Sequence, residues 1–233
     1  MIDLLSTFGS NYAPPLSKGK GAVDSGATIL REAAQSVGYW SKFAAGKLSD
    51  PETRILIAKI ADDARDSVQE IGRRFCAKAL SLPAWAADTL RTLFPRYLGA
   101  AMAAIGTVKP DPSDLAAVDR ATATQGGFLA RFRKAIGSKA VPTLTPQGDP
   151  SPALLSRLGM YGSAAWMVAE AVKRYNRFRL GFQFERRLIH AFHSCTVCIQ
   201  QAALGWVRIG MLLGIGEGSP CVSLCRCSFE FRR

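Results

Sequence analysis

The sequence predicts a mainly α-helical protein that ends in a small β-hairpin unit bearing cysteines. Alanine and leucine are abundant and aromatic residues make up 9% of the chain, a composition that favours helices. Apolar residues recur at three- and four-residue intervals through most of the chain, as they do on the buried face of a helix. Near the C-terminus this period gives way to alternation, and five of the six cysteines follow.

The first part of the chain is expected to be a flexible arm over 1–24, because glycine and proline interrupt it repeatedly. A first helix is expected over about 26–46. The next helix has a clear start, with Asp50 as the N-cap and Pro51 at the first helical position. Its apolar stripe consists of Ile57, Ile60, Ala64, Val68, Ile71, Phe75 and Ala79.

Three further helices are expected before residue 137. Pro83 and Pro95 bracket a short one, and an alanine-rich packing helix covers 96–107. Another starts at about 113, where Gly126 and the glycine after it are expected to kink it. These helices together define a predicted helical domain over 25–136.

A proline-rich segment over 137–152 is predicted to be a linker and to mark a domain boundary. The tail domain over 153–233 then begins with a helix that extends to about Tyr175. A strand is expected after Gly181, and Ser228–Arg233 alternates as a closing strand would. The cysteines lie between these two strands.

The formal charge of +12 indicates a polyanionic neighbour, which could be nucleic acid, a membrane face or an acidic protein surface. The last 69 residues are the most basic part, with ten Lys or Arg against four Asp or Glu. No N-terminal secretion signal and no run of membrane-spanning length are evident, so synthesis in a reducing cytoplasm and no membrane partner are expected. Clustered cysteines in that compartment favour metal binding over disulfides.

The cysteine spacing predicts a zinc knuckle, in which two close pairs of thiolates hold one tetrahedral ion. The preferred ligand set is Cys195, Cys198, Cys225 and Cys227, with Cys221 and His193 as alternates. His190 is a further nearby donor. Three alternatives stay open: reduced cysteines that pack as small apolar groups, a disulfide, and a nucleophilic cysteine paired with His193.

Basic residues in the tail form a second candidate site. Lys173, Arg174 and Arg177 recur on the predicted helix, and Arg186 and Arg187 follow shortly after it. They are expected to present a positive patch to DNA or to an acidic protein surface, although plain surface charge is the simpler alternative.

At these residues the chain resembles phage minor head proteins of the Mu F-like head morphogenesis family. The matching pieces include Glu185-Arg186-Arg187, Cys195 and Cys198, the segment from Gly214 to Pro220, and Cys225-Arg226-Cys227. The resemblance covers about residues 155–233. The chain differs where many relatives have His-Pro before the last cysteine pair.

The resemblance implies a structural virion component that acts in head assembly at or near the portal and is not an enzyme. Portal or major capsid protein would be its partners, with non-specific contact to packaged DNA and an oligomeric arrangement in the phage head or neck. Two other functions stay open. One is a zinc-knuckle nucleic-acid-binding protein outside the virion, and the other is a cysteine-dependent hydrolase or toxin-like effector.

Overall fold

The computed structural model describes residues 20–190, 195–217 and 224–233, and it is mainly helical, as predicted. Its elements are α1 (Lys20–Ser36), α2 (Trp40–Ala44), α3 (Asp50–Cys76), α4 (Leu82–Ile105), α5 (Pro112–Gly137), α6 (Pro152–Arg179), β1 (Phe184–Leu188), α7 (Thr196–Ala203), β2 (Val207–Arg208) and β3 (Ser228–Arg232). Among the described residues, no helix combines the length and apolarity that a membrane crossing requires.

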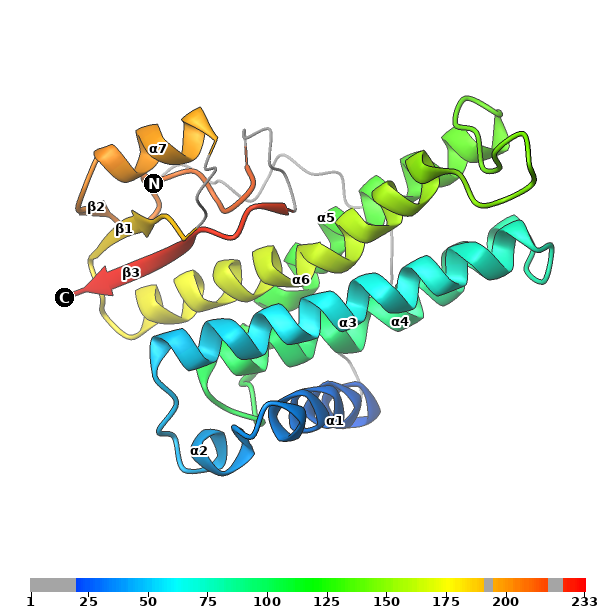
Figure 1. The fold of residues 1–233 in the computed structure, drawn as a ribbon. Helices are drawn as coiled ribbons and strands as arrows, with labels where there is room; N and C mark the ends of the chain where they lie inside the picture. Colours follow the sequence, from blue (N-terminus) through cyan, green and yellow to red (C-terminus); the bar gives the residue numbers. More distant parts are fainter. Residues whose placement is uncertain (1–19, 191–194, 218–223) are drawn as a thin grey trace.

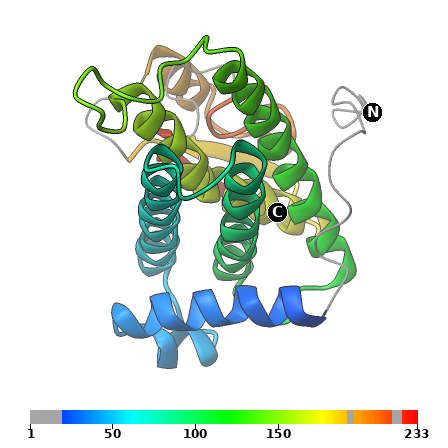
Figure 2. The same ribbon diagram turned by 90° about the vertical axis from the view of Figure 1, so that its right-hand side faces the viewer.

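The long helices α3, α4, α5 and α6 pack along one another and enclose the core (Figure 1). Trp85 and Tyr97 of α4 are fully buried in this core, as is Leu154 of α6. Helix α1 crosses α4 and α3 on the side of the bundle opposite the sheet (Figure 2). The crossing is close because Gly26 of α1 and Gly99 of α4 have no side chains to separate the two backbones.

The strands form a three-stranded antiparallel sheet in the order β2-β1-β3. Strand β1 pairs with β3 from Phe184 opposite Arg232 to Leu188 opposite Ser228. Both strands lie where the alternating pattern placed them. They do not form the expected hairpin, because α7 and β2 lie between them in sequence and β2 pairs with the other edge of β1.

The starts of the first helices differ from the sequence prediction. Helix α1 already begins at Lys20, and residues 1–19 of the expected arm lie outside the described residues. The cap of α3 is Ser49 and not Asp50. The Ser49 hydroxyl accepts a hydrogen bond from the Glu52 backbone N–H, and the Glu52 carboxylate accepts one from the Ser49 backbone N–H at 3.0 Å. This reciprocal capping box fixes the first turn one residue earlier.

Two helices continue past residues at which the sequence predicts a helix end or a kink. Pro95 lies inside the continuous helix α4, although an interior proline removes a hydrogen bond and costs about 3 kcal/mol. Phe94 and Tyr97, on either side of it, are buried against the neighbouring helices, and this packing holds the helix together. Helix α5 likewise runs unbroken through Gly126 and Gly127.

The segment 137–152 is an ordered loop within one packed body, so the predicted boundary does not separate two cores. Ser151 donates a hydrogen bond to the Pro142 carbonyl at 2.6 Å, and Thr145 and Asp149 bond through their backbones. Helix α6, which we assigned to the tail domain, packs along α3 and α4. Most of the apolar residues of α6 are buried against the N-terminal helices, and this packing joins the two predicted domains into one core.

Candidate metal centre

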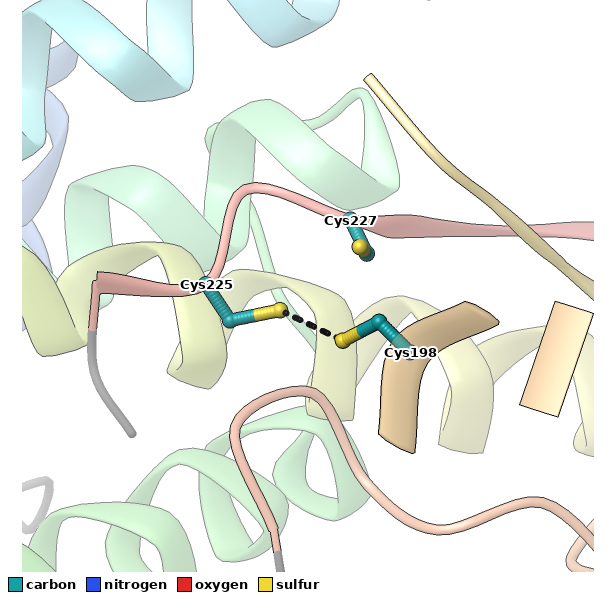
Figure 3. A group of neighbouring side chains, drawn as sticks. All are labelled: Cys198, Cys225 and Cys227. Atoms are coloured by element: carbon teal, nitrogen blue, oxygen red, sulfur yellow. Dashed lines mark hydrogen bonds between the residues drawn. The ribbon is translucent and has the colours of Figure 1, made fainter. Parts of the chain in front are cut away.

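Three cysteines converge where the sheet meets the bundle. The sulfur atoms of Cys198, Cys225 and Cys227 all lie within 4.8 Å of one another, and all three residues are buried. Cys198 comes from α7, whereas Cys225 and Cys227 come from the segment that leads into β3 (Figure 3). The sulfurs of Cys198 and Cys225 face each other at 3.5 Å. Three thiols in this arrangement could bind a metal ion.

The other predicted ligands are not part of this three-cysteine cluster as the structure describes it. Cys195 precedes α7 and is half-buried; its side chain interacts with that of Cys198 but lies outside the group in which all sulfurs are within 4.8 Å. The alternates Cys221 and His193 lie outside the described residues. His190 is not in the cluster, because its Nε2 atom lies 2.6 Å from the Ser228 hydroxyl. None of the five described cysteines forms a disulfide.

The thiols of the cluster have unequal proton affinities. The hydrogen bond from the Cys227 thiol lowers the pKa of Cys225 to about 5, and the same bond raises the pKa of Cys227. Burial, with the contact to Cys195, raises the pKa of Cys198 to about 11. The hydrogen bonds within the cluster therefore favour thiolate at Cys225 over Cys198 and Cys227.

Helix α6 holds the segment that carries Cys225 and Cys227. The Trp166 indole N–H donates to the Cys227 carbonyl at 2.8 Å, and the Glu170 carboxylate accepts from the Phe229 backbone N–H at 3.0 Å. Glu170 is buried, and burial raises the pKa of its carboxyl group. Positions 166 and 170 are one helical turn apart, so both side chains face β3. The cluster is thus tied directly to the bundle.

A buried ion pair connects the sheet to the same helix. Arg174 of α6 donates from Nε to the Glu185 carboxylate of β1 at 2.7 Å, and from Nη2 to the Leu212 carbonyl at 2.7 Å. Glu185 is fully buried and also accepts from the Gly210 backbone N–H at 3.0 Å. The sequence analysis did not identify Glu185 as the buried carboxylate that joins β1 to α6 and to the loop after β2. Its place at an inward position of an alternating strand was the available signal.

Arg187, two residues along β1, reaches the cysteine cluster. It is 3% exposed, its Nη1 atom lies 3.5 Å from the Cys198 sulfur, and its Nη2 atom donates to the Leu213 and Gly214 carbonyls. The guanidinium therefore joins β1, α7 and the loop after β2. A positive charge in this place favours thiolate at the cluster.

The predicted basic patch is not one exposed surface. Lys173 and Arg187 are buried, and Arg174 is engaged by Glu185. Arg186 pairs with Glu230 at 2.5 Å, and the Arg177 guanidinium lies over the Phe182 ring. The strand alternates and returns onto α6, which turns these side chains towards partners within the chain.

The fold and the cluster define a helical bundle protein with a small sheet unit and a cysteine site that could hold a metal ion. Comparison of the chain with protein families, curated proteins and solved structures found no match.

Proposed function

We propose that the cysteine site holds one zinc ion that fastens the C-terminal unit to the bundle. The observation that carries this proposal is the convergence of Cys198 with Cys225 and Cys227 from segments 27 residues apart. Sulfur ligands and a tetrahedral site suit zinc, and Cys195 is the described residue placed to supply a fourth thiolate. The ion would act in structure and not in turnover, because the three sulfurs are buried.

Elemental analysis of the purified protein is expected to give about one zinc per chain, as a single site of four thiolates requires. The Cys76→Ser variant is the matched control, because Cys76 lies at the end of α3 and donates to the Thr143 carbonyl at 3.4 Å, away from the cluster. It should keep the same zinc content. A metal-free wild-type protein with a folded tail would contradict the proposal.

We further propose that the protein is a structural component of a phage head or neck, made in the host cytoplasm and assembled at or near the portal. Support comes from the resemblance of residues 155–233 to minor head proteins. The buried residues Cys198, Cys225 and Cys227 belong to the cysteine pairs on which that resemblance rests. Portal or major capsid protein would be its docking partner, and it would form part of an oligomeric assembly close to packaged DNA.

Quantitative mass spectrometry of purified particles encoded by the same genome tests this role. The chain is expected at a fixed low copy number relative to the portal protein, and it should stay with the particle through density-gradient purification. Absence from particles, together with accumulation in the host cell fraction, would instead favour the cellular zinc-knuckle protein.

The hydrolase alternative has less support. A cysteine nucleophile has to reach its substrate, and Cys198, Cys225 and Cys227 are each at most 3% exposed. Cys195, the cysteine nearest to His193 in sequence, is half-buried, and its side chain interacts with that of Cys198. Arg187 and the chain around the cluster cover the sulfurs. This burial suits ligation better than attack on a substrate.

A further inference from the structure

The end of the bundle farthest from the sheet carries a concentration of positive charge. It comprises the turn between α3 and α4 and the C-terminal end of α5, which Figure 2 views from that side. Residues 70–82 and 128–140 contain seven basic residues, namely Arg73, Arg74, Lys78, Arg131, Arg133, Lys134 and Lys139, against one acidic residue, Glu70. We call these seven side chains the bundle-end surface.

Most of this charge is not neutralised by an ion pair among the described residues, although the Arg131 guanidinium lies over the Phe128 ring. Arg73 pairs with Glu70 at 3.2 Å, whereas the other six form no ion pair within the part of the chain that the structure describes. Five of those six are exposed, and Arg133 is half-buried. The contrast with the tail is direct, because there Arg174 and Arg186 are engaged by carboxylates.

Contacts between the two segments place the charges on one end. Leu82 at the start of α4 lines an open groove of about 680 Å³ together with Arg131, Arg133 and Lys134 of α5. Inside the bundle, Trp85 of α4 packs edge-on against Phe132 of α5 at 6.1 Å. Three of the seven basic side chains therefore line one open groove, and the other four lie on the same end of the bundle.

Two of the lysines occupy strained backbone positions. Lys78 and Lys139 each have φ of 59°, and they are the two non-glycine residues with positive φ among those described. Each lies just beyond the end of a helix, where glycine is the usual residue. A lysine in this conformation is less favourable than glycine, and its attraction to the helix dipole offsets part of that cost. Lysine at both places adds charge to the bundle-end surface at a cost in stability.

The neighbouring side chains decide which anion fits. Trp85 and Phe132 are buried between helices at this end, and the two half-buried rings are already in contact, Phe75 with Trp85 and Phe128 with the Arg131 guanidinium. Among the described residues of this end, no fully exposed ring is therefore offered to stack on unpaired bases. Among the described exposed large apolar residues, Leu144 is the one in the adjoining loop, so the surface lacks the apolar anchors typical of protein interfaces. Exposed guanidinium and ammonium groups around a shallow groove match backbone phosphates.

We propose that the bundle-end surface binds the phosphate backbone of double-stranded nucleic acid without reading its sequence. The inference rests on the charge distribution and not on the zinc site or the virion role. Its failure would leave both of those proposals untouched, and their failure would leave it standing.

Fluorescence anisotropy with a labelled DNA duplex of about 25 base pairs, from about 50 to 200 mM potassium chloride, tests the proposal. The test variant replaces Lys78, Lys134 and Lys139 with glutamine. The matched control replaces Lys47, Lys59 and Lys109, which are equally exposed lysines elsewhere on the chain. Both variants lose three charges of the same kind, and circular dichroism and thermal unfolding check that both are folded.

The slope of log affinity against log salt should fall by about three in the test variant, roughly one for each lost phosphate contact. The control should keep the wild-type slope to within about one contact. A second duplex of unrelated sequence should bind the wild-type protein equally well. Equal flattening by both variants would assign binding to overall charge and overturn the proposal. Absence of salt-dependent binding by the wild-type protein would also overturn it, and binding of an acidic protein in place of DNA would assign the surface to protein docking.

Discussion

Replacement of Cys198 by serine is expected to unfold the C-terminal unit while the helical bundle stays folded. Cys198 brings α7 to the segment that carries Cys225 and Cys227, and serine is a poor ligand for zinc. Structural zinc contributes about 10–16 kcal/mol in small zinc domains, so loss of the proposed ion would remove most of the stability of a unit with a core this small. The expected destabilisation of the unit is at least several kcal/mol.

Hydrogen exchange read by mass spectrometry checks this result. In the Cys198→Ser variant, amides of β1, α7 and β3 should exchange much faster than in the wild-type protein, whereas those of α3 and α4 should keep their protection. The Cys76→Ser variant should match the wild-type protein throughout. A Cys198→Ser protein that keeps both its zinc and the slow amide exchange of β3 would show that the cysteine cluster does not hold the C-terminal unit to the bundle.

Replacement of Gly162 by alanine is expected to destabilise the bundle as a whole. A Cβ atom at position 162 in α6 would lie 2.3 Å from the backbone N and Cα atoms of Arg65 in α3. Neither backbone can yield without separating the two helices, so we expect a cost of about 3 kcal/mol, at the upper end for overpacked cores. In a chain of this size that corresponds to a fall in Tm of roughly 6–12 °C.

Gly127 of α5 supplies the matched control, because it is also a helical glycine and a Cβ atom there would meet nothing within 4 Å. The Gly127→Ala variant should keep or gain up to about 1 kcal/mol through helix propensity. Thermal and urea unfolding of both variants make the comparison. Equal stability of the two variants would mean that α3 and α6 cross less closely than the structure places them.

Unfolding of the Gly162→Ala variant also reports on domain organisation. Because α6 packs on helices from the first half of the chain, the long helices should unfold in one transition. Two separate transitions with a boundary near residue 145 would restore the division that the proline-rich segment suggested.

The sequence by itself determined the mainly helical class, the two longer strands and the group of cysteines from which the cluster is drawn. Each of these rests on local information: helical periodicity in α3 and α6, alternation around Phe184 and Phe229, and the short spacing of Cys225 and Cys227. Local patterns fix which face of an element is apolar, and they fix which thiols can approach one ion through a turn.

Only the tertiary structure decided what these elements pack against. Pro95 predicts a helix end, yet α4 continues through it because neighbouring helices bury its surroundings. Arg174 and Arg187 look like surface charges until β1 brings Glu185 and the Cys198 sulfur to them. Side-chain burial depends on contacts between segments distant in sequence, and a local pattern does not specify which segments meet. Exposed charge without an ion pair therefore gathers at the far end of the bundle, around Lys78 and Lys139, although the last 69 residues have the largest excess of basic over acidic residues in the sequence.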